Sequence, residues 1–409
     1  MKRLFRPGKL IDGTSTTALG GMAVLVEGER IVAVAPAGEF GSAEGCEIVD
    51  APGATLMPGL IDAHVHLAFS GSLDRKAFRA EHVDMNYAEI ALRALRYAED
   101  TLRAGFTSLR DMHAPGGAII DLRRAISAGH VRGPRIKACG AGLSIRGGHM
   151  DQPGWGDHVA FTGMTAPCDG PDGFRRGVRE QIKRGADFIK INSSTSSTRT
   201  PGVYGRLEMS PDEIRAVCDE AHQCEVKVAS HTVGGTPVAE TIRNGVDCVE
   251  HAHFTDETTI ALMVENGTYF VPTLLVNERN FDFTREALGV PVRNWAWLEA
   301  SREAKWETLA RARAAGVRIC SGSDAGFMIT HGSDNWGEIA LLVKGGLTEM
   351  EAIIAATATN ADLLEIEAGR IAPGKLADLL VVDGDPLADI AILRQQGALT
   401  VYLGGEKVD

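Results

Sequence analysis

The sequence predicts an α/β protein: a (β/α)8 TIM barrel joined to a small β-sandwich domain that both chain termini build. Residues 57–369 alternate short apolar runs with amphipathic stretches, which is typical of parallel strands connected by helices. Residues 1–56 and 370–409 hold short apolar runs broken by Gly, Asp and Pro, a pattern that favours strands and hairpins. Because 409 residues exceed what one compact core usually spans, we expect the barrel and the sandwich as separate domains.

Eight segments of the middle region have the length and apolar character of buried strands: 60–66, 107–111, 135–139, 188–191, 226–231, 248–251, 269–273 and 317–321. Helical stretches separate several of them, at 87–104, 119–128, 171–184, 211–223 and 236–244. Eight strands with intervening helices fit a closed barrel better than an open doubly wound sheet. Neither a P-loop nor a G-x-S-x-G elbow is present in the sequence.

The two flanks are expected to pack on each other. Strand-like runs occur at 22–26 and 31–34 in the first flank and at 379–382 and 399–403 in the last. The first flank is too short to close a core of its own, so the last flank is its expected partner. Two separate small units are the alternative.

Composition excludes several function classes. The formal net charge of −12, from 42 basic and 54 acidic residues, argues against nucleic acid or an anionic membrane as the main partner. The amino terminus has no apolar h-region and no run is long enough to cross a bilayer, which predicts a cytoplasmic protein. The seven cysteines never form C-x-x-C and are expected to be reduced thiols rather than metal ligands.

The stretch 57–66 reads Met-Pro-Gly-Leu-Ile-Asp-Ala-His-Val-His. In an extended strand Asp62, His64 and His66 share one face, so two imidazoles converge. Neutral imidazoles are good ligands for Zn²⁺ and similar ions. Two surface histidines would give the same pattern, so the rest of the chain must supply further ligands.

Further residues of ligand type do follow other predicted strands. Lys190, His231, His251 and Asp324 lie at or near the carboxyl ends of four of them. In a (β/α)8 barrel these ends meet at one rim, where the active site lies. Together with His64 and His66, the pattern predicts a metal site assembled from five strands.

With these motifs the chain resembles the amidohydrolase superfamily, in particular its imidazolonepropionase-related branch of Xaa-Pro dipeptidases (prolidases) and carboxypeptidases. The resemblance runs from residues 58–66 to Gly-Lys-Leu-Ala-Asp-Leu at 374–379. It implies two divalent ions, usually zinc, and a homo-oligomer. By the same resemblance, His64, His66 and Asp324 bind one ion, His231 and His251 the other, and Lys190, carboxylated by carbon dioxide, bridges both.

The resemblance implies hydrolysis of an amide by a hydroxide that bridges the two ions, with Asp324 moving the proton to the leaving nitrogen. It places His149 and Tyr204 on the substrate, and Arg146, Arg199 and Arg206 are further candidates for holding a carboxylate. The expected partner is a small carboxylate-bearing molecule: an Xaa-Pro dipeptide, another dipeptide or an N-acyl amino acid.

Two other functions remain open. A mononuclear cyclic-amide hydrolase or deaminase of the same superfamily lacks the bridging lysine, and nucleoside deaminases carry His-x-x-Glu where this chain has His231 followed by Thr-Val-Gly. A catalytically dead scaffold would have lost ligands, and all six are present. The aromatic insertion at 277–315 and the roles of His113 and His253 are undecided at this point.

Overall fold

The computed structural model describes residues 2–41, 45–74, 77, 80–81, 84–149, 151, 165–195, 205–290 and 292–409. Two parallel sheets form its larger part, one in the order β6-β7-β8 and one in the order β10-β9-β11-β12-β13-β14-β15. Their strands are β6 (Leu60–Val65), β7 (Phe106–Asp111), β8 (Arg135–Ala138), β9 (Gly142–Ile145), β10 (Thr165–Cys168), β11 (Ile189–Asn192), β12 (Val228–Thr232), β13 (Cys248–His251), β14 (Tyr269–Val271) and β15 (Arg318–Ile319).

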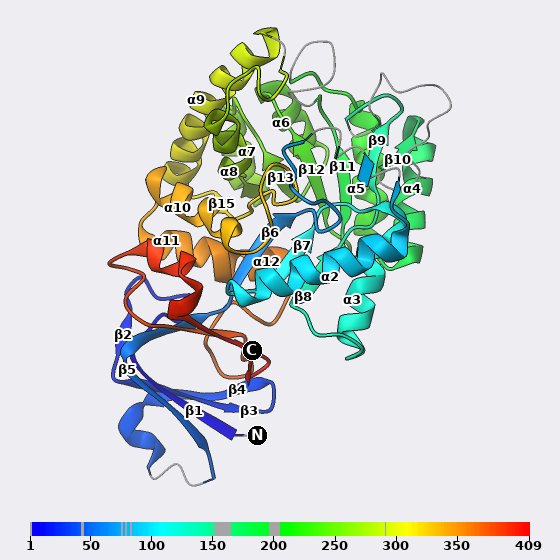
Figure 1. The fold of residues 1–409 in the computed structure, drawn as a ribbon. Helices are drawn as coiled ribbons and strands as arrows, with labels where there is room; N and C mark the ends of the chain where they lie inside the picture. The colour runs from blue at the N-terminus through cyan, green and yellow to red at the C-terminus, as the bar shows by residue number, and fades with distance from the viewer. Residues whose placement is uncertain are drawn as a thin grey trace.

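Helices surround these strands (Figure 1). They are α2 (Tyr87–Arg103), α3 (Ala118–Ser127), α4 (Gly170–Arg184), α5 (Pro211–His222), α6 (Gly235–Arg243), α7 (Glu257–Asn266), α8 (Leu274–Arg279), α9 (Val292–Ala315), α10 (Gly337–Lys344), α11 (Glu349–Ile354) and α12 (Asn360–Leu364). Local chemistry sets where helices begin: Ser210 accepts a hydrogen bond from the backbone N–H of Glu213 at the start of α5. None of the helices in the described ranges is both long and apolar enough to pass through a lipid bilayer.

The predicted α/β class is confirmed, and all eight expected strand segments form strands whose ends lie within two residues of those expected. The strands β9 and β10 are additional. Both are only four residues long, and the proline and glycines around them suppress a strand signal.

Most of the parallel strands, including β6, β7, β11, β12 and β13, are buried on both faces, which explains their apolar runs. In β11, Ile189 and Ile191 belong to the core shared with the helices. A second apolar cluster takes Phe188, Ala229 and Cys248 from the other face of neighbouring strands.

Backbone hydrogen bonds also join β6 to the segment after β15. Ala63 N–H donates to the Ser321 carbonyl at 2.9 Å, and His66 N–H donates to the Ala325 carbonyl at 2.8 Å. The first strand is thereby held beside the last one, and both deliver their ends to the same place.

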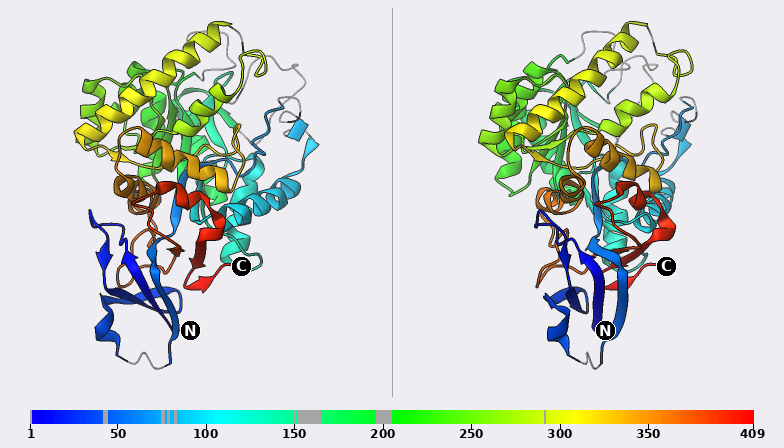
Figure 2. Two further views of the ribbon diagram at one scale, coloured as in Figure 1. Left: turned by 60° about the vertical axis from the view of Figure 1, so that its left-hand side comes forward. Right: turned by 90° about the vertical axis from the view of Figure 1, so that its left-hand side faces the viewer.

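Strands from the two chain ends form one eight-stranded sheet in the order β18-β17-β16-β5-β1-β3-β4, with β2 paired to β1. Its strands are β1 (Lys2–Leu10), β2 (Leu19–Gly20), β3 (Met22–Glu27), β4 (Arg30–Pro36), β5 (Glu47–Pro58), β16 (Leu379–Val382), β17 (Leu399–Leu403) and β18 (Glu406–Lys407). This sheet lies to one side of the parallel strands, with both termini on it (Figure 2). Phe5 from the start of the chain packs edge-to-face on Tyr402 from its end, with ring centroids 4.9 Å apart.

The terminal sheet connects directly to the first parallel strand. Gly59 separates β5 from β6, and its N–H donates to the Asp378 carbonyl at 2.8 Å. A Cβ atom at this position would lie 2.2 Å from the Thr107 hydroxyl, so only glycine permits the approach of β6 to β7. The motif 57–66 therefore crosses from the terminal sheet into the parallel sheet.

Candidate active site

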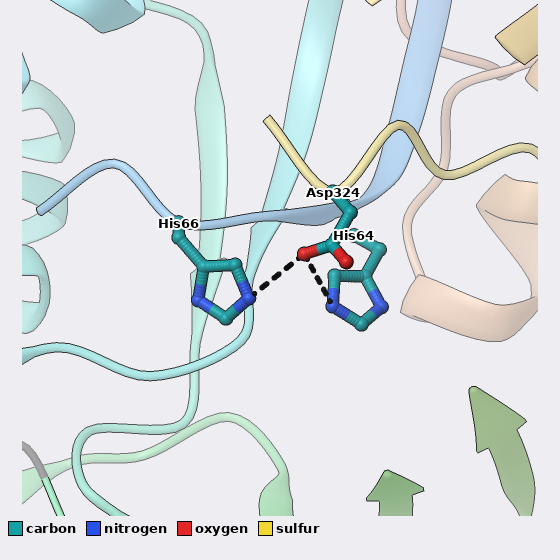
Figure 3. Close-up of side chains that lie close together, drawn as sticks. All are labelled: His64, His66 and Asp324. Atoms are coloured by element: carbon teal, nitrogen blue, oxygen red, sulfur yellow. Dashed lines mark ion pairs between the residues drawn. The ribbon is translucent and has the colours of Figure 1, made fainter. Parts of the chain in front are cut away.

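Three side chains of ligand type converge where β6 ends. One ligand atom each from His64, His66 and Asp324 lies within 4.8 Å of the other two, and all three residues are buried. Asp324 Oδ1 is 3.2 Å from His66 Nε2 and 3.4 Å from His64 Nε2 (Figure 3). Two imidazoles and a carboxylate directed at one point form a donor set that suits Zn²⁺ and related divalent cations.

The backbone brings Asp324 to this point. Asp324 N–H donates to the His64 carbonyl at 2.8 Å, and Asp324 has a left-handed φ of +60°. Gly322 and Gly326 on either side have no side chain to separate the segments: a Cβ would lie 2.7 Å from His64 Cβ at the first and 2.8 Å from His66 Cβ at the second.

A buried chain of charged groups orients His64. Its Nδ1 is 2.7 Å from Glu250 Oε2, and Arg110 Nη2 donates to Glu250 Oε1 at 2.6 Å. Glu250 is fully buried and Arg110 is 3% exposed. Burial raises the pKa of Glu250, but the Arg110 charge and the His64 hydrogen bond outweigh it and lower the pKa to about 2. The ionised Glu250 carboxylate accepts a hydrogen bond from Nδ1–H. Burial lowers the pKa of His64, but Asp324 and Glu250 outweigh it and raise the pKa. A cation that displaces the Nε2 proton would bind the lone pair of this nitrogen.

A second group of imidazoles lies next to the first. The rings of His231 and His251 have centroids 4.6 Å apart, and the ring of His251 lies 5.3 Å from that of His64. His251 Nδ1 is 2.6 Å from Thr273 Oγ1, and the buried Lys305 ammonium donates to the Thr273 carbonyl at 2.6 Å. The contact with Thr273 therefore orients the ring of His251, as the contact with Glu250 orients the ring of His64.

His149 also reaches this group: its ring stacks on that of His231, with centroids 4.0 Å apart and planes 11° apart. Its backbone N–H donates to Glu208 Oε2 at 2.8 Å. The stacking on His231 places His149 at the edge of the site.

Lys190 lies inside β11, flanked by the buried Ile189 and Ile191, and is only 2% exposed. Burial lowers its pKa, and the Arg110 charge acts in the same direction, while Glu250 opposes both. A lysine in this position is closer to its neutral amine form than an exposed lysine.

The protonation states of His66, His231, His251 and Asp324 suit cation binding. Burial lowers the pKa of His66 to about 4 and the pKa values of His231 and His251 well below the ordinary value. Burial raises the pKa of Asp324, but the neighbouring His64 and His66 outweigh it and hold it well below its ordinary value. Neutral imidazoles and an ionised carboxylate are the forms that bind metal ions.

Unpaired buried atoms provide a test of whether these residues fit a cation. Within the described ranges, Asp324 Oδ1 and His231 Nε2 are buried and make no hydrogen bond. A buried polar atom without a partner is unfavourable by about 1–3 kcal/mol. Together with the neutral His66, His231 and His251, these atoms fit divalent cations bound where these strands end.

Other expected contacts have different outcomes. Tyr204 and Arg199 lie outside the described residues. The Arg146 side chain is 71% exposed and pairs with Asp169 at 3.2 Å. Glu250 and Arg110 were missed by sequence reasoning, although a charged residue inside each of two apolar strands was a usable signal, because buried charges are normally paired.

Comparison with known proteins identifies the class. The model of the amidohydrolase family matches residues 55–408, so the chain belongs to that family. It is 30% identical over 375 residues to ochratoxinase of Aspergillus niger, covering 86% of this chain and 75% of the relative.

Two solved structures extend this likeness to the whole chain. A Xaa-Pro dipeptidase with methionine bound in its active site has a TM-score of 0.89 at 31% identity, with 100% of both chains covered. A prolidase complexed with N-methylphosphonate-L-proline has a TM-score of 0.86 at 31% identity, also with 100% of both chains covered. The resemblance inferred from the motifs is thus confirmed at the level of the family, whose members hydrolyse C–N bonds and typically use divalent metals.

Proposed function

We propose that this protein is a binuclear zinc-dependent hydrolase that cleaves the amide bond of a small carboxylate-bearing substrate. The observation that carries the proposal is the convergence of His64, His66 and Asp324, with His231 and His251 next to them. In this proposal the first three would hold one ion, His231 and His251 would hold the second, and Lys190, carboxylated to a carbamate, would be a ligand of both. The neutral amine that burial favours at Lys190 is the form that reacts with carbon dioxide.

The chain's own residues then have defined tasks. Bound divalent cations supply Lewis acidity and make water nucleophilic near neutral pH. Asp324, ionised and beside the reacting atoms, accepts a proton from the attacking water and returns it to the leaving nitrogen. His149, on the ring of His231, and Tyr204 contact the substrate carboxylate.

The similar proteins support the substrate class. Two of the structurally similar proteins are a Xaa-Pro dipeptidase and a prolidase. We therefore propose an Xaa-Pro dipeptide, another dipeptide or an N-acyl amino acid as substrate.

For the architecture we propose that the two parallel sheets close into a (β/α)8 barrel over residues 57–369. The hydrogen bonds between β6 and residues 321–325 support closure at one seam. At the other seam, between β8 and the residues before β11, the Asp187 N–H donates to the Ala138 carbonyl at 2.9 Å. Residues 1–56 and 370–409 form the proposed sandwich domain. A cytoplasmic homo-oligomer is the proposed cellular form.

A mononuclear cyclic-amide hydrolase or deaminase is the second candidate. Within the described part of the chain, His231 and His251 do not belong to the three-residue cluster of ligand atoms. The number of ions bound per chain decides between the two candidates.

The test combines metal content with turnover. Protein loaded with zinc and bicarbonate is assayed against Xaa-Pro dipeptides and N-acyl amino acids, and bound zinc is counted by mass spectrometry. We expect two ions per chain, one ion in Lys190→Ala, and a fall in turnover of roughly a hundredfold or more in that variant. Lys183→Ala, at an exposed position of α4, is the matched control. One ion in the wild type, or unchanged turnover in Lys190→Ala, contradicts the binuclear proposal.

A further inference from the structure

His253 is a buried histidine that the proposed mechanism does not use. It is 6% exposed, and neither ring nitrogen has a hydrogen-bond partner among the described residues. Neutral imidazole has one donor and one acceptor, so leaving both unpaired in the interior is unfavourable. A ligand that binds from outside the chain would give these nitrogens the partners that the described residues do not provide.

His253 lies between the proposed metal ligands and an aromatic cluster. Its ring centroid is 6.3 Å from that of His251 and 5.9 Å from that of Trp297. Trp297 belongs to a small apolar cluster, separate from the main core, that comprises Phe281, Phe283, Leu288, Val290, Trp295, Trp297, Leu298 and Met328. Met328, four residues after Asp324 in the sequence, packs against this cluster.

The backbone around His253 is strained. His251, Ala252 and Phe254 have φ values of +70°, +44° and +61°, and Met328 has +60°. Left-handed conformations of non-glycine residues cost about 1–3 kcal/mol each and persist where a site requires one geometry. The fold therefore accepts strain on both sides of His253 to hold its ring in place.

The order of ring contacts along the site suggests how a substrate would be oriented in it. From His149 the contacts run to His231, then to His251, then to His253 and finally to Trp297. His149 and Trp297 are thus the two ends of this row, with the proposed ligands His231 and His251 between them. If the carboxylate of the leaving amino acid binds beside His149, the acyl half of the amide extends toward His253 and Trp297.

We infer that His253 and Trp297 form the subsite for the acyl half of the substrate, which is a dipeptide with a large apolar amino-terminal side chain. The side chain packs on Trp297 and its cluster, and the free α-amino group hydrogen-bonds to His253. This inference rests on the proposed function, because it takes the scissile amide to lie at the metal ligands. It assigns the insertion at 277–315 a role in specificity.

The test uses three non-hydrolysed probes that share L-proline and differ only on phosphorus: N-methylphosphonate, N-(2-phenylethyl)phosphonate and N-(1-amino-2-phenylethyl)phosphonate. Affinity for the metal-loaded protein is measured by calorimetry. We expect the phenylethyl probe to bind roughly tenfold or more tighter than the methyl probe, because it buries an aromatic ring. We expect the amino probe to bind a further roughly tenfold tighter.

Each variant should remove one of these increments. Trp297→Leu should abolish the gain from the phenyl group, and His253→Phe should abolish the gain from the amino group while keeping the ring's volume. Trp306→Leu on the same helix and His222→Phe on the outer helix α5 are the controls and should keep both gains. Trp306 packs beside Lys344, and His222 Nε2 contacts Asp247 at 2.8 Å.

Equal affinity for the three probes, or gains that survive in Trp297→Leu and His253→Phe, overturns this inference. If the wild type then still cleaves amides and binds the methyl probe, the proposed function stands without the subsite. If no amide is cleaved and no probe binds, both fail.

Discussion

The candidate active site and the terminal sheet differ in whether their buried polar side-chain atoms have hydrogen-bond partners. At the carboxyl ends of the parallel strands, side-chain atoms of His66, His231, His253 and Asp324 are buried without hydrogen bonds. Among the described residues in 2–58 and 371–409, which form the terminal sheet, no buried side-chain nitrogen or oxygen is in that position.

Backbone strain follows the same division. In the terminal sheet, positive φ values in the described residues occur at glycines. Near the site they occur at residues with side chains: His251, Ala252, Phe254, Thr273, Asp324 and Met328. Within the described residues the terminal sheet pairs its buried side-chain polar atoms internally, whereas the site contains buried atoms that a bound ligand would pair.

The largest difference should come from Asp324→Asn. Asparagine tolerates the left-handed φ, so the fold should persist, while loss of the proton acceptor should lower amide hydrolysis about 10³-fold. Steady-state kinetics and urea unfolding of the metal-free protein measure the two effects. A large loss of stability would mean that Asp324 also stabilises the fold, which contradicts the proposed contrast between the site and the terminal sheet.

The converse substitution is Phe5→Ala in the terminal sheet. Phe5 is 1% exposed and packs on Tyr402, so its truncation should lower the free energy of unfolding by about 3–4 kcal/mol. Turnover per folded molecule, measured well below the unfolding midpoint, should stay at the wild-type value. A changed turnover would show that the sheet influences the site through β5 and β6.

A smaller effect, on zinc affinity, is expected from a substitution at Glu250, the buried carboxylate that links Arg110 to His64. Glu250→Gln keeps the shape but weakens the hold on His64 Nδ1, which should reduce zinc affinity roughly 10- to 100-fold. Chelator competition measures this, with Glu240→Gln as control, since Glu240 is a partly exposed residue of α6 that pairs with Arg243. Unaltered zinc affinity would mean that Glu250 does not position His64.

The smallest effect concerns His331, a partly buried residue whose Nε2 is 3.0 Å from the Phe69 carbonyl oxygen and whose pKa is lowered by burial to about 4. The unfolded chain takes up this proton near pH 6.5 and the folded chain does not, so stability is complete above pH 6.5 and falls as the pH drops toward 4. Between pH 7.5 and 5.0 this residue should account for about 1–2 kcal/mol of the loss. The pH dependence of urea unfolding should be weaker by that amount in His331→Gln, and an identical pH dependence would contradict the assignment.

Much of the fold and part of the site could be predicted from sequence because they rest on local patterns. The apolar runs around Ile189 and Phe270 predict buried parallel strands, and His64 with His66 predicts a pair of ligands, since strand periodicity fixes which side chains share a face. The strands β9 and β10 were not predicted, because their four-residue lengths carry too little periodic signal.

By itself the sequence determined the alternation of strands and helices, the family motifs and the residue types that bind cations. Only the tertiary structure decided which buried groups orient the histidines: Glu250 and Arg110 at His64, and Thr273 and Lys305 at His251. It also decided that His253 is buried beside Trp297 without a hydrogen-bond partner among the described residues. The physical reason is that these contacts join different strands and helices, so their geometry depends on packing between elements that no local pattern encodes.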